Sequence, residues 1–177
     1  NGSERIYHFL KENNINSKFI VNIQGDEPFF DIQKVEKMIE QFIDDHQKNK
    51  INVCGTLFYK TKEHEIINSC NKVKLIINYN NHILYGSRNV IPGNKQNNIL
   101  NCDYFIHIGI FIFEKKYLTD KYYGNTTFYQ DIEDLEWLKI LEQDYKIIAY
   151  EAQFHEVGVD TMDDYYYLKN KYELQKK

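Results

Sequence analysis

The chain alternates short apolar segments with amphipathic helical patterns, and this alternation constrains its fold more than any other feature. Residues 19–23 (FIVNI) are almost continuously apolar, as in a parallel strand that is covered on both sides. Asp31 can cap the helix that follows. The apolar residues of that helix repeat with helical spacing: Ile32, Val35, Met38, Ile39, Phe42 and Ile43. Strand–helix alternation predicts a layered α/β fold with a largely parallel central sheet.

The same patterns predict the remaining elements. Expected helices cover residues 1–14, 61–68, 115–123, 132–143 and a last segment that includes Tyr167 and Leu168, and expected strands cover residues 51–59, 104–114 and 145–152. Ser3, Asp131 and Thr161 are the expected helix caps. Residues 72–88 place two apolar runs around Asn80 and Asn81, which predicts a hairpin. The sequence therefore predicts a single domain over residues 1–177, a three-layer α/β/α sandwich with a mixed, mostly parallel sheet.

Composition excludes several classes of protein. A length of 177 residues allows one domain with a substantial core. The net charge of −4 gives no reason to expect nucleic acid as a partner, and no apolar run approaches the roughly 20 residues of a membrane helix. Cys54, Cys70 and Cys102 lack the spacing of a disulfide framework or a zinc site. They favour a reducing compartment, the cytoplasm or alternatively an organelle matrix.

Two acidic residues follow predicted strands. Asp26 follows the strand at residues 19–23, and Asp160 lies in the segment GVDT before the last helix. Ligands of open α/β sheets bind beyond the carboxyl ends of the strands, so both residues are expected at one edge of the sheet. Taken singly, each is more simply a turn or capping residue. Taken together they suit Mg²⁺, which accepts one or two carboxylates along with substrate phosphates.

Other polar residues are ambiguous by themselves. Arg88 is as readily a solvated surface residue as a ligand-binding one. His107 lies inside an apolar strand, where a histidine is more commonly part of the core. Glu133 and Glu136 are three positions apart on an expected helix, which normally makes a solvated face.

Several segments together give the chain a resemblance to a known family. In chain order they are VNIQGDEP, YGSRNVIP, HIGIFIF, LEWLK and GVDT. Their order and spacing resemble those of the 3-deoxy-manno-octulosonate (Kdo) cytidylyltransferases, the CMP-Kdo synthetase family. NGSERI is similar to that family's S-G-T-[DE]-R segment, and NKVKLIIN is similar to its V-K-V-V strand. The resemblance spans essentially all 177 residues.

The resemblance implies a fold, a reaction and partners. The fold is a Rossmann-related nucleotide-diphospho-sugar transferase fold. The reaction joins CTP and Kdo to give CMP-Kdo and pyrophosphate, with Mg²⁺ as cofactor, in lipopolysaccharide biosynthesis. A homodimer is also implied, and we expect its interface at residues 89–102 and the flanking strand.

The resemblance also assigns site residues. Asp26 and Asp160 match the family's magnesium ligands and are the expected catalytic residues. The residues that match positions around the sugar acid are Gln24, Arg88, His107 and Glu136. Ser3 and Arg5 match a segment near the nucleotide.

These assignments suit nucleotidyl transfer. The anomeric hydroxyl of the sugar attacks the α-phosphorus of CTP, a step that needs alignment and neutralisation of phosphate charge. Magnesium held by Asp26 and Asp160 can bind an α-phosphate oxygen and lower the pKa of the attacking hydroxyl. The planar guanidinium of Arg88 suits the sugar carboxylate. Gln24 and Glu136 can exchange hydrogen bonds with sugar hydroxyls.

The sequence also departs from the family pattern. Phe111 stands where the family commonly has Tyr, Trp137 replaces an amide, Lys139 replaces Arg and Gly93 replaces Trp. No segment matches the family's basic, glycine-containing loop that holds the triphosphate. We therefore expect the chain to be the carboxy-terminal two-thirds of a cytidylyltransferase domain, which alone binds CTP weakly or not at all and shows no turnover. A catalytically silent homologue that serves as a binding or dimerisation module is one alternative, and an enzyme for another sugar acid, such as sialic acid, is a second.

Overall fold

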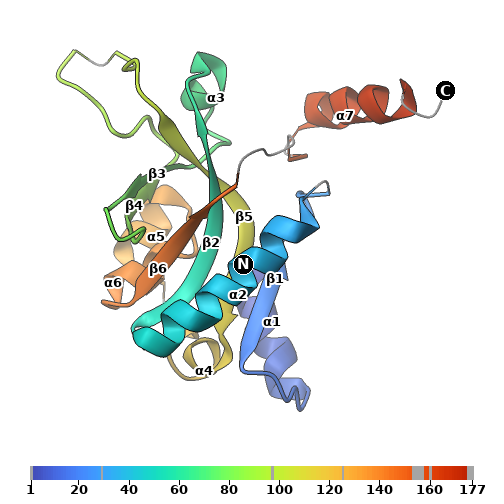
Figure 1. The fold of residues 1–177 in the computed structure, drawn as a ribbon, viewed down its shortest axis with the longest axis vertical. Coiled ribbons are helices and arrows are strands. Elements are labelled where there is room, and N and C mark those ends of the chain that lie inside the picture. Colours follow the sequence, from blue (N-terminus) through green and yellow to red (C-terminus); the bar gives the residue numbers. More distant parts are fainter. Residues whose placement is uncertain are drawn as a thin grey trace.

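The computed structural model describes residues 2–28, 30–96, 98–124, 126–152, 158–159 and 161–174. The elements run in the order α1 (Gly2–Glu12), β1 (Phe19–Ile23), α2 (Ile32–Lys48), β2 (Asn52–Thr61), α3 (His64–Asn68), β3 (Lys74–Ile77), β4 (Ile83–Ser87), β5 (Tyr104–Glu114), α4 (Lys115–Tyr117), the π-helix η1 (Leu118–Tyr122), α5 (Phe128–Glu133), α6 (Leu138–Glu142), β6 (Lys146–Glu151) and α7 (Met162–Leu174). Figure 1 shows the helices arranged around one central sheet. None of the described helices has the length and apolar character needed to cross a membrane.

The sheet is six-stranded and mixed. Its order is β4–β3–β5–β2–β6, and β1 also pairs with β5. The mixed sheet and the hairpin of β3 and β4 confirm the prediction. The expectation of mostly parallel strands is wrong for the described part of the chain: β5 runs antiparallel to β1, β2 and β3, and the β2–β6 ladder is the parallel one there.

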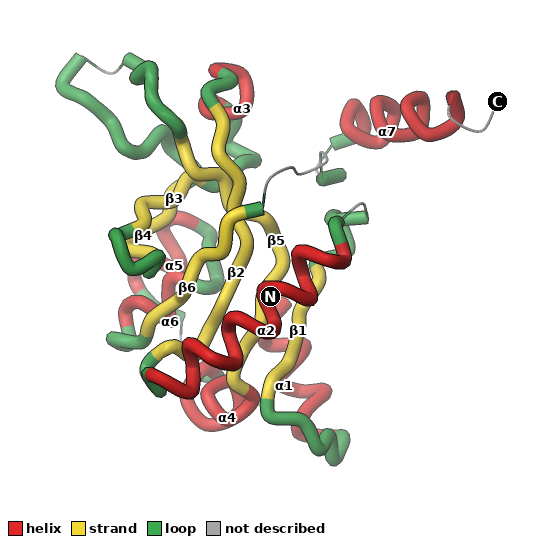
Figure 2. The backbone as a smooth tube through the Cα atoms, in the orientation of Figure 1, coloured by secondary structure: helices red, strands yellow, loops and turns green. Residues whose placement is uncertain are grey.

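Helices cover both faces of the sheet, which confirms the three-layer architecture (Figures 1 and 2). On one face, Val35, Met38 and Phe42 of α2 pack against strand residues such as Leu57 and Ile110. On the other face, a larger cluster joins the sheet to α1, α4, η1 and α6. The spacing of apolar residues in α2 thus produced the buried helix face that the sequence predicts.

Two of the expected helix caps are confirmed. The carboxylate of Asp31 accepts hydrogen bonds from the backbone amides of Gln33 and Lys34 at the start of α2. The hydroxyl of Thr161 accepts one from the Asp164 amide, and the Asp164 carboxylate accepts in return from the Thr161 amide. This reciprocal pair is a capping box at the start of α7.

The caps assigned to Ser3 and Asp131 are wrong. Ser3 lies within α1 and is buried, because that helix already begins at Gly2. Asp131 lies within α5, whose N-cap is Thr127. The expected helix over residues 132–143 is interrupted at Asp134, whose φ of 51° is left-handed. A helix cannot continue through such a residue, so α5 ends there and α6 starts at Leu138.

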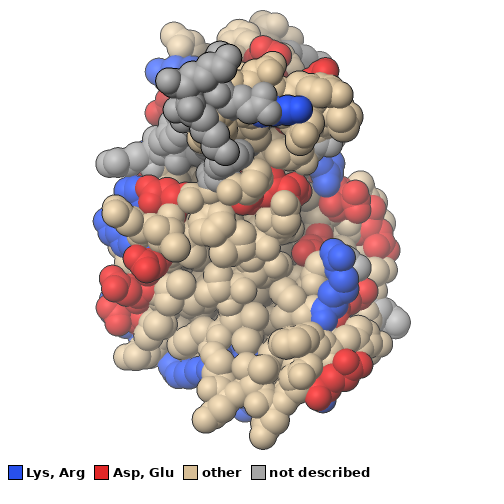
Figure 3. Space-filling view, turned by 90° about the vertical axis from the view of Figure 1, so that its right-hand side faces the viewer, with Lys and Arg blue, Asp and Glu red and all other residues tan. Residues whose placement is uncertain are grey.

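Strand β1 is less covered than its apolar sequence predicts. It pairs with β5 on one edge, and within the described residues no strand pairs with its other edge. Val21 is 37% exposed and Ile23 is 40% exposed. The side of the molecule that carries α1 and β1 shows a broad area without charged side chains (Figure 3). Helix α7 extends away from the layered body (Figure 1).

Candidate functional site

The site lies at one edge of β5, between two short strands that pair with different parts of that edge. β1 pairs with residues 110–114 of β5, and β3 pairs with residues 105–106 on the same edge. Both short strands run antiparallel to β5, so the end of β1 points toward the start of β3. Residues 107–109 of β5 lie between them, bordered by Gln24 and Val73, whose backbones bond to Gly109 and His107.

Gly109 brings the segment after β1 close to β5. The Gly109 amide donates to Glu27 Oε1 at 3.2 Å, and the Gly109 carbonyl accepts from the Gln24 amide at 3.2 Å. The side chain of Gln24 lies directly over this glycine: a Cβ at position 109 would be 2.2 Å from Gln24 Oε1. The absence of a side chain at residue 109 therefore gives Gln24 its place in the site.

Thr56 fixes the ring of His107. The buried Thr56 hydroxyl lies 2.9 Å from His107 Nε2, 2.8 Å from the Ile110 carbonyl and 3.3 Å from the Ile108 carbonyl. A hydroxyl has one proton to donate, and the carbonyls can only accept it, so the hydroxyl accepts from Nε2–H. The β2–β5 register shift between Thr56 and Leu57 brings these groups together.

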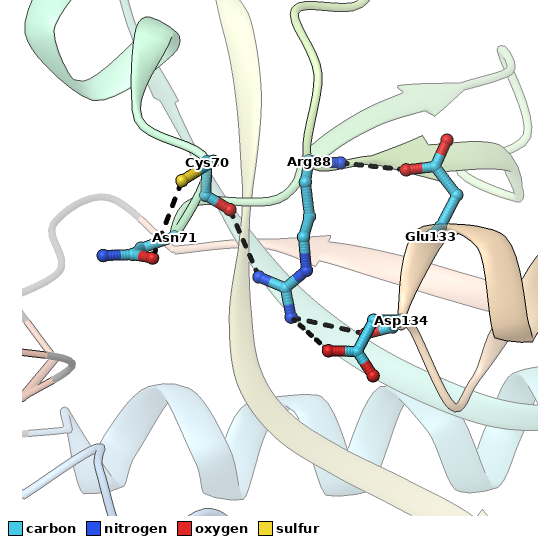
Figure 4. A network of polar contacts seen from close by, with 5 residues as sticks. All are labelled: Cys70, Asn71, Arg88, Glu133 and Asp134. Atoms are coloured by element: carbon cyan, nitrogen blue, oxygen red, sulfur yellow. Dashed lines mark hydrogen bonds and ion pairs between the residues drawn. The ribbon is translucent and has the colours of Figure 1, made fainter.

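Arg88 is held from two sides (Figure 4). Its Nη1 donates to the Cys70 carbonyl at 3.2 Å, and its Nη2 donates to the Asp134 carbonyl at 3.3 Å. The Asp134 carboxylate lies 3.8 Å from Nη2, in an exposed ion pair. Arg88 Nε is buried and has no hydrogen-bond partner within the described part of the chain. The guanidinium is therefore oriented by backbone carbonyls, and one of its buried donors is unsatisfied by the residues that the structure describes.

Glu133 holds the end of β4. Its carboxylate accepts from Ser87 Oγ at 2.8 Å, from the Tyr85 hydroxyl at 3.0 Å and from the Arg88 amide at 3.3 Å. Burial, the hydrogen bond from the Tyr85 hydroxyl to Glu133 and the charge of Glu133 raise the pKa of Tyr85 to about 12. Tyr85 therefore keeps its proton at neutral pH and remains a donor to Glu133.

Glu136 connects the α5–α6 turn to α1. Its Oε2 accepts from the backbone amide of Ser3 at 3.1 Å, and its carbonyl accepts from the Tyr122 hydroxyl at 2.8 Å. The next residue, Trp137, is buried over Gly86, where a Cβ would be 2.3 Å from the indole ring. Glu136 therefore lies in the turn between α5 and α6. The sequence pattern predicts instead that Glu133 and Glu136 share one helix, and that prediction is wrong.

Next to these contacts lies a cavity with a volume of about 340 Å³. Among the predicted site residues, it is lined by Gln24, Asp26, Arg88, His107 and Glu136. Ser3 is next to Gly2, which lines the cavity, and bonds to Glu136. Arg5 is exposed on α1 and is not part of the lining. Asp160 lies outside the described residues.

The chain next to Asp160 lies against Asp26. The Val159 amide donates to the Asp26 carbonyl at 2.7 Å, and Gly158 is close enough that a Cβ there would be 3.2 Å from the same oxygen. Among the residues that the structure describes, no three His, Cys, Asp or Glu side chains gather as a protein-only metal site would require. Asp26 is exposed and lines the cavity.

Comparison with known proteins decides the family. Residues 1–150 match the Cytidylyltransferase family. The chain belongs to the cytidylyltransferase family. A 3-deoxy-manno-octulosonate cytidylyltransferase from Fusobacterium nucleatum is 36% identical over 145 residues, which is 82% of this chain and 57% of that protein. A mitochondrial 3-deoxy-manno-octulosonate cytidylyltransferase from Arabidopsis thaliana is 32% identical, over 93% of this chain and 55% of that protein.

A solved structure has the same fold. It is a CMP:2-keto-3-deoxy-manno-octonic acid synthetase in complex with CTP, with a TM-score of 0.83 at 21% identity. The match covers 99% of this chain and 69% of that one. The chain thus spans less than two-thirds of the length of the curated cytidylyltransferases named above and 69% of this solved chain.

Sequence reasoning missed several polar residues of this chain. Thr56 and Glu133 orient His107 and the end of β4, and Glu27 and Lys72 line the cavity itself. Glu27 carries a local signal, since it directly follows Asp26. Thr56 carries none, because it contacts His107 from 51 positions away in the sequence.

Proposed function

We propose that this chain carries the site at which a sugar acid of the 3-deoxy-manno-octulosonate type attacks CTP, giving the CMP-sugar and pyrophosphate. The observation that carries the proposal is the single cavity that brings together Gln24, Asp26, Arg88, His107 and Glu136. These residues come from separate segments, and their types suit an acidic, polyhydroxylated substrate. The relatives bearing that activity in their names support the same reaction.

Arg88 is the proposed partner of the sugar carboxylate. Its guanidinium lines the cavity and is already oriented by the carbonyls of Cys70 and Asp134. A carboxylate is the acceptor that such a planar, charged donor binds best. Because the side chain is held in place before binding, little conformational entropy is lost when the substrate arrives.

His107, Gln24 and Glu136 are the proposed partners of the sugar hydroxyls. The Nε2–H of His107 donates to Thr56, which fixes the ring where it lines the cavity. Gln24 is fixed over Gly109, and Glu136 is tied to α1 through the Ser3 amide. Such positioning aligns the attacking hydroxyl, which is the main requirement of phosphoryl and nucleotidyl transfer.

Asp26 and Asp160 are the proposed ligands of Mg²⁺. Asp26 fits this role because it is an exposed carboxylate in the cavity lining. The Val159–Asp26 hydrogen bond supports the pairing, because it brings the residue before Asp160 to the Asp26 backbone. When bound, the ion supplies neutralisation of phosphate charge and a lower pKa for the attacking hydroxyl.

The test measures pyrophosphate release by the full natural protein with CTP, Mg²⁺ and Kdo. Asp26→Asn keeps the size of the side chain and removes its charge, so kcat is expected to fall by at least about 100-fold. The midpoint of thermal unfolding is expected to stay the same, because residue 26 is exposed. Asp44→Asn, at an exposed position on α2 outside the cavity, is the matched control and should retain full turnover.

Three results would count against this proposal. Wild-type turnover by Asp26→Asn would remove the metal role of that residue. Wild-type protein that releases no pyrophosphate with any sugar acid would favour the binding or dimerisation module. Acceptance of sialic acid together with refusal of Kdo would change the substrate but keep the reaction.

A further inference from the structure

Lys74 is a fully buried lysine whose amine donates to three backbone carbonyls. Its exposed fraction is 0%. Nζ donates to the Ser69 carbonyl at 2.9 Å, to the Lys72 carbonyl at 2.7 Å and to the Arg88 carbonyl. An ammonium has three hydrogens, so these carbonyls satisfy all of its donors. Burying such a cation costs free energy unless its donors are hydrogen-bonded in this way. We therefore ask what these three hydrogen bonds hold in position.

The carbonyls belong to two segments that form one wall of the cavity. Asn71, Lys72 and Val73 line the cavity on one side of this contact, and Arg88 lines it on the other. The Arg88 side chain returns to the same turn, because its Nη1 donates to the Cys70 carbonyl. Figure 4 shows Arg88 reaching between Cys70 and Asp134. Lys74 holds the backbone of both segments, and Arg88 bridges them with its side chain.

We propose that Lys74 is a positioning residue for the anionic substrate, a role that rests on the proposed function. Its charged amine ties residues 69–72 to the backbone of Arg88, and so sets where the Arg88 guanidinium and the Lys72 side chain stand at the cavity. Lys74 itself does not line the cavity, so it acts through these two cations.

The protonation state of Lys74 makes this role measurable. Burial lowers its pKa to about 8, an effect that Arg88 reinforces and that Cys70 and Glu133 oppose. The neighbouring strand positions are Ile106 of β5 and Ser87 of β4, which carry no charge. Loss of the proton leaves two hydrogens and a lone pair for the three carbonyls, so one contact becomes repulsive. The wall of the cavity is therefore expected to loosen as pH rises through about 8.

The experiment measures kcat and KM of the full natural protein for Kdo and for CTP from pH 6.5 to 9.5. In the wild type, KM for Kdo should rise through about pH 8 while KM for CTP changes little. The sugar carboxylate is ionised throughout this range, so its own titration does not produce the step. Lys74→Met retains the length of the side chain without its charge, and should raise KM for Kdo roughly 10- to 100-fold with no step near pH 8. Lys62→Met, at a position whose side chain is 61% exposed, should behave as wild type.

The outcomes separate this inference from the proposed function. A wild-type KM for Kdo in Lys74→Met would overturn the role of Lys74, because turnover would continue without the amine. If Lys74→Met does not fold, as judged by circular dichroism, the wild-type profile decides, and a KM for Kdo that is flat from pH 7 to 9.5 would overturn it. No pyrophosphate release by the wild type at any pH would instead overturn the proposed function.

Discussion

Gly109 has no side chain, so the side chain of Gln24 can pack directly against the backbone of β5 at the cavity. Its carbonyl and amide bond to the Gln24 amide and to the Glu27 carboxylate, so the segment after β1 lies flat on β5. With any side chain at residue 109, Gln24 would have to leave the space above it. The backbone conformation is not the reason for this glycine, since its φ is not positive. Close approach of the two segments is the reason.

Gly109→Ala tests this close approach. The added Cβ would be 2.2 Å from Gln24 Oε1 and 3.0 Å from Gln24 Cδ, so the amide must turn away from its position. Because the displaced atoms are the flexible end of a side chain, the loss in free energy of unfolding should be only about 1 kcal/mol. Loss of alignment should lower kcat/KM for Kdo by roughly 100-fold, measured as pyrophosphate release.

The matched control for this change is Gly93→Ala, where the nearest atom to a Cβ is 3.8 Å away. That variant should retain both stability and turnover. If Gly109→Ala were as active as wild type, the position of Gln24 would not matter for the reaction.

At the scale of elements, the α5–α6 turn contributes four consecutive residues to the cavity. Its residues Asp134, Leu135, Glu136 and Trp137 all line the cavity. They can do so because the left-handed Asp134 ends α5 and separates these residues from a regular helix. The turn is stabilised from the far side by α6, since Glu142 reaches back to the first amides of α5.

Glu142 acts as a cap that comes from another helix. Its carboxylate accepts from the amides of Tyr129 and Gln130 and from the Thr127 hydroxyl. Partial burial raises the pKa of Glu142, but these hydrogen bonds outweigh it and lower the pKa below its ordinary value of 4.5. A carboxyl whose pKa is depressed on folding stabilises the protein above its unfolded pKa, and this stabilisation is lost as pH falls through the folded pKa.

Glu142→Gln should therefore destabilise the protein in a pH-dependent way. At pH 7 we expect a loss of about 1 kcal/mol in free energy of unfolding, the low end for a cap because the group is exposed to solvent. At a pH below the folded pKa, the wild type loses the same charge, and the difference should disappear. Urea unfolding of both proteins at neutral and acidic pH measures this.

Glu40→Gln, at an exposed position on α2, is the control and should change the free energy by less than about 0.5 kcal/mol at either pH. An equal loss for Glu142→Gln at both pH values would mean that charge plays no part in the cap.

At the scale of the whole molecule, local patterns were enough for many of the elements. β1 and β5 have the bounds that their apolar runs predict, and Asp31 caps α2 as expected. Gln24, Asp26, Arg88 and Glu136 lie in segments that resemble a family, and all four line the same cavity. Their roles there stay a prediction.

What could not be predicted depends on contacts between distant segments. Thr56 reaches His107 through a register shift between β2 and β5, which alternation of residues does not encode. The burial of Lys74 depends on carbonyls of residues 69, 72 and 88, which meet only after β3 and β4 pair. The break at Asp134 goes against a helical apolar pattern that otherwise continues through Leu138. Tertiary contacts override local propensity at these places.

Of the two core clusters on opposite faces of the sheet, one contributes described residues to the cavity lining and the other does not. This difference leads to a prediction about the whole fold. Phe111, Leu135 and Trp137 belong to the core cluster on one face and also line the cavity. The cluster under α2, on the other face, contributes none of the described lining residues. Stability that comes from α2 should therefore be separable from the geometry of the site.

Phe42→Ala tests this separation. Phe42 is 0% exposed, packs edge-on against Phe19 at 5.6 Å between ring centroids, and fills the space beside Gly55. Its truncation leaves a cavity in the core and should lower the free energy of unfolding by about 3–5 kcal/mol. Ile32→Ala on the same helix, where the side chain is 62% exposed, should cost less than about 0.5 kcal/mol. Below the unfolding transition, as established by circular dichroism, kcat and KM of Phe42→Ala should equal those of the wild type. A raised KM in fully folded Phe42→Ala would show instead that the α2 face sets the geometry of the cavity through the sheet.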